Sequence, residues 1–391
     1  MTEVLVIAPT PFFSDRGCHV RIFELSRSLQ KLGYDPLILT YPAGEDPPGV
    51  SVTRMRGWSW YRKVEAGPAW PRLLIDLSLL KQAARLLREQ KPKLVYAFLH
   101  EGCAIARVLR PLYGVPFVFD YQGSMTMESL QHGFIREGWL EKAFRAAERR
   151  LDASADHIVT SAAELGRDLE ERGLPVSTVP DGVDPDRFSP GEPEASLRAR
   201  LGLPDDMPLL VYLGVMSDYQ GVDILLDSAL ILQREGVSAH FLLMGYPEDF
   251  YKDKAKAMGL GDSVTFTGRV DYFKAADYLR LGAAALAPKL SRTESNGKVL
   301  NYMACGLPVV AFDLAVNREL LGSEAEWATV AGDRQGCAEE FARAIADILS
   351  DRDKAARLSE AGRKRAVENF SLERQAEKLA HVCANVIARA G

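Results

Sequence analysis

Short apolar runs alternate along the chain with longer stretches in which apolar side chains recur every three or four residues. The first pair joins a strand-like VLVIA, beginning at Val4, to a stretch with Ile22, Leu25 and Leu29 on one face, which Gly33 ends. Repeated strand and helix patterns are typical of parallel sheets covered by helices on both faces. We therefore predict the α/β class, with doubly wound Rossmann-like sheets.

The apolar runs form two series separated by a stretch rich in turn residues. Strands are predicted at 36–40, 94–98, 116–120 and 157–160, and again at 209–213, 240–244, 264–267, 283–287 and 308–312. Between the series, residues 179–193 read VPDGVDPDRFSPGEP, and Pro, Gly and Asp at this density favour turns over packed structure. We place the domain boundary here, which gives domains of residues 1–186 and 187–371. Residues 353–389 read as two further helices that separate near 369–372.

Length and composition agree with two globular domains. A chain of 391 residues exceeds what one hydrophobic core usually supports. Its 47% apolar content contains no run of about 20 apolar residues, so no membrane-spanning helix is expected. The start lacks the pattern of a secretory signal, which favours a cytoplasmic protein. Five cysteines without metal-ligand or redox spacing are expected to be structural thiols.

Charge is spread unevenly along the chain. The formal net charge of -5 argues against nucleic acid as a partner, yet residues 51–150 carry 17 Lys and Arg against 9 Asp and Glu. Within that segment, Gly57 to Arg72 mixes three tryptophans with basic side chains. Such a mixture suits peripheral contact with the inner membrane face or with a lipid-linked sugar, and a partly buried flap is an equal alternative.

Ligands of doubly wound sheets bind beyond the carboxyl ends of the strands, so the loops there are the candidate sites. The loop 9–18, PTPFFSDRGC, is closed by Gly17, which suits either close approach to an anionic ligand or a tight turn. The loop 214–221, GVMSDYQG, resembles a phosphate cradle but lacks the ending of an ATPase P-loop. Residues 267–270, TGRV, end a strand and are a weaker candidate for contact with a planar base.

The strongest candidate is the stretch KLSRTESNGKVLNYMACGLPVVAFD, residues 289–313. A polar loop here enters a short helix at Gly297 and Lys298, which ends at Gly306. A helix start offers unbonded N–H groups and a dipole equivalent to about half a positive charge, and Lys298 stands beside them. This arrangement would bind a diphosphate. The alternative is a capped helix with a solvated lysine.

These motifs, in this order and along essentially the whole chain, resemble those of the family 4 retaining glycosyltransferases. VPDGVDPDRF and YMACGLPVV are the most specific pieces. The resemblance implies the GT-B fold, in which two Rossmann-like domains face a cleft and the last helix, here 372–391, returns to the first domain. It also implies transfer of an α-linked sugar with retention of configuration, with no obligatory metal and no cofactor.

The resemblance also implies roles for single residues. Gly17 would face the donor diphosphate, Arg269 and Val270 would lie near the base, and Glu294 would hold the sugar hydroxyls. The second family glutamate, which holds the ribose, falls on Asn301, and Gln122 stands where relatives often have His. The predicted catalytic residues are Lys298, Glu294 and Gln122, and the predicted donor-binding residues are Gly17, Gly214, Arg269, Val270, Arg292, Ser295, Asn296, Gly297, Val299 and Asn301.

Several positions depart from the family pattern. Family members commonly carry Arg and Lys where this chain has Val215 and Gln220, so both of these basic phosphate contacts are missing. Glu294 and Asn301 are separated by six residues instead of seven. We therefore expect Lys298, helped by Lys289 or Arg292, to meet the phosphate charge.

The predicted function is transfer of a hexose-type sugar from a nucleoside diphosphate sugar to an acceptor hydroxyl. The acceptor would be a sugar, a lipid-linked sugar or a small molecule. Two alternatives stay open, a sugar-nucleotide epimerase on the same fold and a non-catalytic nucleotide-sugar-binding protein. A Rossmann dehydrogenase is disfavoured because the glycine fingerprint is missing.

Overall fold

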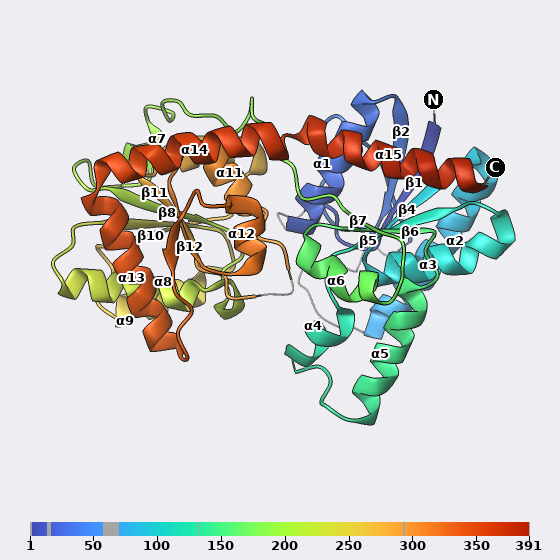
Figure 1. The fold of residues 1–391 in the computed structure, drawn as a ribbon, viewed down its shortest axis with the longest axis horizontal. Coiled ribbons are helices and arrows are strands. Elements are labelled where there is room, and N and C mark those ends of the chain that lie inside the picture. The colour runs from blue at the N-terminus through green and yellow to red at the C-terminus, as the bar shows by residue number, and fades with distance from the viewer. Residues whose placement is uncertain (1, 14–16, 58–69, 132, 292–293, 391) are drawn as a thin grey trace. The chain divides into compact units, whose positions relative to one another are not determined.

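The computed structural model describes residues 2–13, 17–57, 70–131, 133–291 and 294–390. It divides the chain into two compact units, each with its own core (Figure 1). Unit 1 comprises Met1–Gly182 and Leu372–Gly391, and unit 2 comprises Val183–Ser371. The division precedes Val183 instead of following residue 186, because Val183 and Phe188 are both buried in a core cluster of unit 2.

Unit 1 contains a seven-stranded parallel sheet of order β3-β2-β1-β4-β5-β6-β7 in its described residues. The strands are β1 (Thr2–Ala8), β2 (Tyr34–Thr40), β3 (Ser51–Arg54), β4 (Leu94–Phe98), β5 (Phe117–Tyr121), β6 (His157–Thr160) and β7 (Val176–Thr178). The inner strands β4 and β5 are buried along their whole length, which fits a sheet covered on both faces. Strand order reverses between β1 and β4, so the first ligand crevice is expected at their carboxyl ends.

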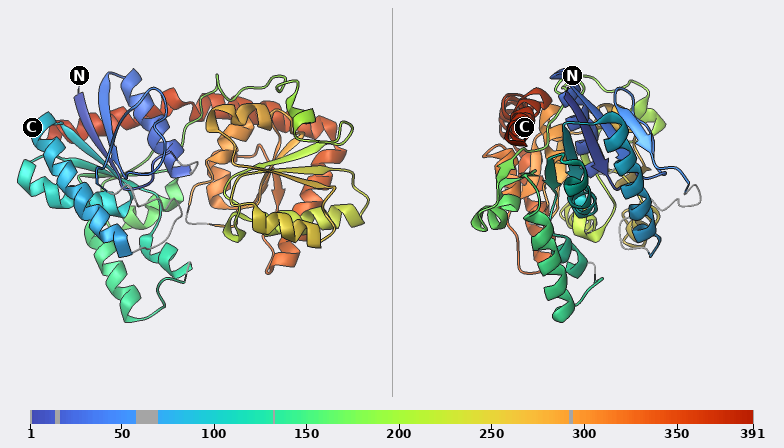
Figure 2. Two further views of the ribbon diagram at one scale, coloured as in Figure 1. Left: turned by 180° about the vertical axis from the view of Figure 1, so that it is seen from behind. Right: turned by 90° about the vertical axis from the view of Figure 1, so that its right-hand side faces the viewer.

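Helices cover both faces of this sheet (Figure 2). They are α1 (Gly17–Lys31), α2 (Trp70–Gln90), α3 (Leu99–Tyr113), α4 (Met125–Gln131), α5 (Trp139–Asp152), α6 (Ala163–Glu171) and α15 (Leu372–Ala390). α1 packs against α15, and α2 packs against α3. The apolar face of α15 is buried here, so the last helix belongs to the first domain, as predicted.

Unit 2 contains a six-stranded parallel sheet of order β10-β9-β8-β11-β12-β13 in its described residues. The strands are β8 (Leu209–Leu213), β9 (His240–Met244), β10 (Val264–Gly268), β11 (Ala284–Ala287), β12 (Val309–Phe312) and β13 (Glu326–Ala328). The helices are α7 (Leu197–Arg200), η1 (Asp218–Gln220), α8 (Val222–Arg234), α9 (Asp249–Ala257), η2 (Tyr272–Lys274), α10 (Ala275–Leu279), α11 (Lys298–Ala304), α12 (Ala315–Leu321), α13 (Arg334–Ser350) and α14 (Arg352–Phe370). α8 packs on α13 and α11 packs on α14, which gives one apolar cluster on each face of the sheet.

Two doubly wound domains confirm the predicted fold class. Strand order in unit 2 reverses between β8 and β11, and the second ligand crevice is expected at the carboxyl ends of these two strands. Among the described residues, no helix is both long and apolar enough to cross a membrane.

Candidate active site

The loops that follow β8 and β11 meet at the carboxyl edge of the unit 2 sheet. Gly221, with φ +82°, lies so close to Pro288 that an added Cβ would come within 2.4 Å of the Pro288 carbonyl oxygen. Only glycine fits this approach without moving backbone. The two loops are therefore in contact at the point where the strand order reverses.

Lys298 links these two loops. Its Nζ donates a hydrogen bond of 3.0 Å to Oε1 of Gln220 and lies 4.3 Å from the centre of the Tyr212 ring. A Cβ on Gly214 would lie 2.5 Å from the same Nζ. Lys298 thus comes from the first turn of α11 and is held by β8 and by the loop after it.

Burial of the Lys298 ammonium is the main cause that lowers its pKa to about 7, and the charge of nearby Lys289 lowers it further. Glu294 acts in the opposite direction. The surroundings of Lys298 thus shift its pKa, and shifted pKa values are typical of functional sites.

Lys289 and Glu294 form an ion pair in the loop between β11 and α11. Lys289 Nζ donates to Glu294 Oε2 at 2.7 Å and to the Ser295 carbonyl oxygen at 3.2 Å. The Lys289 side chain is 5% exposed and that of Glu294 is 37% exposed. Two lysines and one carboxylate are thereby gathered on one loop and the start of one helix.

Three buried polar atoms of these loops have no hydrogen-bond partner among the described residues. They are Oγ of Ser217, Oγ of Ser295 and Oδ1 of Asn296. Asn296 is fixed from its other side, because its Nδ2 donates to Asn317 Oδ1 at 3.0 Å. Buried groups are rarely left unsatisfied, so these atoms are candidates for contact with ligand oxygens.

The remaining predicted donor-site residues differ in how accessible they are. Val299 is fully buried in the core, and its N–H is bonded to the Asn296 carbonyl oxygen, so this structure does not support the predicted phosphate contact of Val299. The Val270 side chain is buried in the core as well, which leaves its backbone to face a base. Arg269 is exposed and Asn301 is half-buried on α11. Arg292 lies outside the described residues.

Gln122 in unit 1 is oriented by a buried ionic network. Asp120, fully buried, accepts hydrogen bonds from Arg21 Nε at 2.9 Å, from the Tyr96 hydroxyl at 2.7 Å and from Gln122 Nε2 at 3.2 Å. Arg21 also donates to Asp181 at 3.0 Å. Because Nε2 donates to Asp120, the amide of Gln122 is oriented, and its carbonyl oxygen is of a type that accepts a hydrogen bond from a hydroxyl group.

Gly17 begins α1 and is exposed, and an added Cβ would meet nothing within 4 Å. Steric crowding among the described residues therefore does not explain why position 17 is a glycine. The loop before it packs inward up to Phe13, and Thr10 Oγ1 lies 2.5 Å from Nε2 of buried His19. His19 is thereby assigned to the interior of unit 1.

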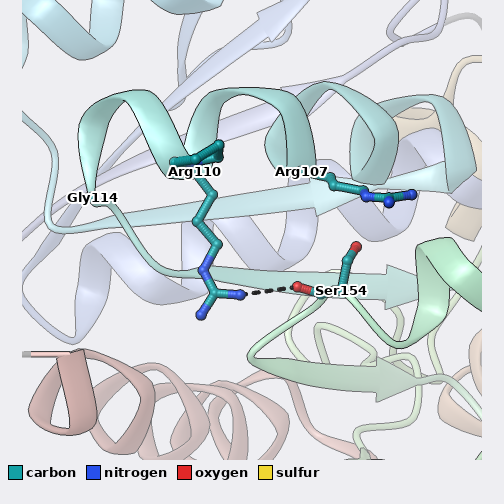
Figure 3. A pocket seen from close by; sticks show the side chains of 5 residues that line it. Arg107, Arg110, Gly114 and Ser154 are labelled. Carbon is teal, nitrogen blue, oxygen red and sulfur yellow. Dashed lines mark hydrogen bonds between the residues drawn. The ribbon is translucent and has the colours of Figure 1, made fainter.

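A shallow surface depression elsewhere on unit 1 does not belong to this chemistry. It is lined by Arg107, Arg110, Pro111, Gly114 and Ser154 (Figure 3). These residues lie at the amino ends of β5 and β6, the opposite edge of the sheet from the ligand crevice. Arg110 is bonded to the Ser154 carbonyl oxygen at 3.2 Å, which indicates a structural role.

The sequence did not predict that Tyr212 and Gln220 contact Lys298. By sequence, Gln220 stands only where family members commonly carry a lysine, and Tyr212 is one position of an apolar strand. Their contact with Lys298 depends on the order of the strands, and the order carries no local sequence signal. The tryptophan-rich stretch 57–72 falls almost wholly outside the described residues.

Two family models match the chain in succession. Residues 16–182 match the Glycosyl transferase 4-like domain, and residues 194–365 match Glycosyl transferases group 1. The two matches coincide with the parts of units 1 and 2 that carry the sites described above.

Curated relatives match over nearly the whole chain. The D-inositol 3-phosphate glycosyltransferase 2 of Catenulispora acidiphila is 29% identical over an alignment of 386 positions, and the match covers 90% of this chain and 85% of that protein. The D-inositol 3-phosphate glycosyltransferase of Thermobispora bispora is 26% identical over an alignment of 398 positions, and the match covers 95% of this chain and 90% of the relative.

Solved structures share the fold at lower identity. The sucrose-phosphate synthase of Thermosynechococcus elongatus has a TM-score of 0.83 at 18% identity and covers 100% of both chains. The Anabaena protein Alr3699/HepE, in complex with UDP and glucose, has a TM-score of 0.77 at 14% identity and covers 98% of this chain and 100% of its own. With both domains matched in sequence and in fold, the chain belongs to the family 4 type of glycosyltransferases and has the GT-B fold.

Proposed function

We propose that this enzyme is a retaining hexosyltransferase that uses a nucleoside diphosphate sugar to build a glycolipid, polysaccharide or other glycoconjugate. One observation carries the proposal. Lys298, Lys289 and Glu294 gather where the strand order of unit 2 reverses, and Lys298 is bonded there to Gln220. Cations there suit a diphosphate, and a carboxylate beside them suits sugar hydroxyls.

The donor would lie along the carboxyl edge of the unit 2 sheet. Its phosphates would contact Lys298 and its sugar would contact Glu294, with the base near Arg269 and the backbone of Val270 and the ribose near Asn301. Solved structures of the same fold support a nucleotide-sugar donor, since the Anabaena protein is described in complex with UDP-glucose and the catalytic domain of Arabidopsis starch synthase IV bound to ADP and acarbose.

In the proposed reaction the acceptor hydroxyl attacks the anomeric carbon on the face from which the diphosphate leaves. The bond from the anomeric carbon to the phosphate oxygen breaks, the new glycosidic bond forms, and the hydroxyl proton passes to a phosphate oxygen. Lys298 stabilises the charge on the departing diphosphate, and a preorganised donor of this kind is worth about 3 kcal/mol of the barrier. Gln122 would accept a hydrogen bond from a substrate hydroxyl. The proposal requires no protein nucleophile and no metal.

We propose that the acceptor binds to unit 1. The names of the curated relatives make a phosphorylated inositol the first acceptor to test. A lipid-linked acceptor has support from α4 and α5, which project from unit 1 in Figure 1. Trp139 at the start of α5 is 79% exposed, Phe134 in the loop before it is 50% exposed, and Lys142 of α5 is exposed as well. Tryptophan beside basic side chains suits the surface of an anionic membrane. Co-sedimentation with anionic vesicles at low salt should weaken in the Trp139→Ser variant.

The donor class can be identified by thermal shift with UDP, GDP, ADP and CMP and with their sugars. A ligand present at 100 times its dissociation constant adds about 2.7 kcal/mol of stability, enough to raise the melting temperature by several degrees. Failure of every nucleotide to shift the protein would overturn the proposal.

Turnover with the identified donor then tests Lys298 directly. We expect Lys298→Ala to lose at least a hundredfold in kcat with its melting temperature preserved, while Lys256→Ala, an exposed lysine of α9 in the same unit, stays at the wild-type rate. Near-normal kcat in Lys298→Ala would exclude the proposed role. Product analysis by NMR shows whether the anomeric configuration is retained, and activity in the presence of EDTA tests metal independence.

A further inference from the structure

The two lysines of the unit 2 site have only one acidic partner among the described residues. Glu294 is bonded to Lys289, which the Ser295 carbonyl oxygen also holds. Lys298 has instead the neutral amide oxygen of Gln220 and the face of the Tyr212 ring. Among the described residues, the site therefore has two lysines and one carboxylate to pair with them.

The groups that face Lys298 come from three segments. β8 supplies Tyr212, the loop after β8 supplies Gln220, and the loop after β11 supplies Lys289 and Glu294. Burial raises the pKa of the Tyr212 hydroxyl, so this hydroxyl stays neutral at physiological pH. The charge of Lys289 repels a charge on Lys298. The carboxylate of Glu294 attracts a charge on Lys298, but its ion pair is with Lys289. Among the described groups, no second carboxylate is paired with Lys298 to compensate for the burial of its ammonium.

We propose that this site binds the diphosphate of its donor together with a proton. In the empty site, a large fraction of Lys298 is the neutral amine. When the donor binds, its phosphates supply the missing negative charge, a proton from solvent adds to the lone pair of Nζ, and Lys298 becomes an ammonium. The inference rests on the proposed function, because it requires a diphosphate at Lys298.

Gln220 is suited to both states of the lysine. Its amide oxygen accepts a hydrogen bond from an ammonium or from a neutral amine, so Nζ keeps its position while its charge changes. A lysine or a carboxylate at position 220 would favour one of the two states. The geometry therefore assigns to Gln220 a positioning role.

The sign of the linkage follows from the depressed pKa of Lys298, about 7 in the empty site. Below this pH the lysine is already charged, and donor affinity is greatest. As the pH rises above it, Lys298 must take up a proton from solvent whenever a donor molecule binds. The donor affinity then falls by up to tenfold per pH unit, until the pH reaches the pKa of Lys298 in the complex. A solvated lysine, with a pKa near 10.4, would give no such dependence around neutrality.

Isothermal titration calorimetry measures this proton directly. UDP-glucose, ADP-glucose and GDP-mannose are the probes, because their phosphates are diesters with no ionisation near neutral pH, unlike a terminal phosphate. Titration in Hepes and in Tris, whose ionisation enthalpies differ, gives the number of protons taken up. For the sugar nucleotide that binds, we expect roughly half a proton at pH 7 and nearly one at pH 8.5.

Two variants assign the proton to its residue. Lys298→Met should bind more weakly and take up no proton, and Lys256→Met, which alters an exposed lysine of α9, should behave as wild type. Binding by the wild-type enzyme without proton uptake between pH 7 and 8.5 would overturn this inference and leave the proposed function standing. Absence of binding by all three sugar nucleotides would overturn both.

A second measurement follows the lysine itself. In protein labelled with ¹³C at lysine Cε, the resonance that disappears in Lys298→Met should titrate with a midpoint near 7 without nucleotide and above 9 with the bound sugar nucleotide. A midpoint near 10 in both states would refute the proton-coupled binding. Because the readout is spectroscopic, it does not depend on turnover.

Discussion

Gly214 shows how closely the unit 2 site surrounds Lys298. A methyl group at this position would lie 2.5 Å from Lys298 Nζ and 2.9 Å from the Tyr212 hydroxyl. The flexible lysine would move aside, so we expect Gly214→Ala to fold but to lose at least tenfold in donor affinity, measured by calorimetry. Gly236→Ala is the matched control, because Gly236 has φ +72° with nothing within 4 Å, and it should lose only about 1 kcal/mol of stability. Unchanged donor affinity in Gly214→Ala would show that the position of Nζ does not matter.

Asp120 allows a test of the ionic network beneath Gln122. Its carboxylate is the buried partner of Arg21, and removal of one member of a buried pair leaves the other charge uncompensated. We expect Asp120→Asn to lower the free energy of unfolding by about 3 kcal/mol in urea titrations. The Asp46→Asn variant removes an ion pair with Arg54 in which the acid is 60% exposed, and it should cost less than about 1 kcal/mol. Equal losses in the two variants would contradict the structural role given to the network.

Single residues of the site were predictable where local sequence carried the signal. Glu294 and Lys298 stand in a motif that sequence alone singles out, and the structure brings both to one loop and helix start. The contact of Lys298 with Gln220, 78 positions away, depends on β8 and β11 being neighbours in the sheet. Val299 is buried because α11 packs into the core of unit 2, and its place just after a polar loop gave no sign of this packing.

At the scale of elements, apolar runs predicted the inner strands and the edge strand β10 (Val264–Gly268), but not the other edge strands. β4, β6, β8 and β9 span the predicted residues, because inner strands of a covered parallel sheet are continuous apolar runs. β3, β7 and β13 were not predicted. Each is an edge strand of three or four residues, and β3 and β7 read SVTR and VST with no buried side chain. Such strands form because a neighbour offers hydrogen bonds, and their own sequence carries little signal.

Helix α15 provides a test of how unit 1 is held together. It follows unit 2 in sequence but buries its apolar face in unit 1, where it packs against α1. Leu379 of this helix is fully buried, so Leu379→Ala should cost about 3 kcal/mol and lower the unfolding midpoint of unit 1. His381→Ala, exposed on the same helix, should change stability by less than about 0.5 kcal/mol. Hydrogen exchange by mass spectrometry assigns the loss, and faster exchange confined to unit 2 peptides would contradict this packing.

At the scale of the whole molecule, the chain folds into two units, each with its own hydrophobic core. Two series of alternating strands and helices were enough to predict two doubly wound domains. The boundary depends on which core buries Val183 and Phe188, and the turn-rich segment around them does not carry that information. Because each unit has its own core, a ligand held mainly by unit 2 should stabilise that unit more than unit 1.

Hydrogen exchange with and without the bound sugar nucleotide tests this separation. We expect slower exchange at 214–221 and 288–300, the segments that carry Gln220, Lys289 and Lys298, because a ligand bound only to the native state suppresses their opening. At 100 times the dissociation constant, the protection of globally exchanging amides in unit 2 should rise by about 2.7 kcal/mol.

In unit 1, protection is expected only at the start of α1, around Gly17, the one unit 1 residue proposed to face the diphosphate. Lys298→Met should remove most of the protection in unit 2, because it removes the charge that holds the phosphates. Equal protection of all unit 1 strands would show that the two cores respond as one cooperative body. Protection of unit 2 without any change at Gly17 would remove Gly17 from the donor site and leave Lys298 in it.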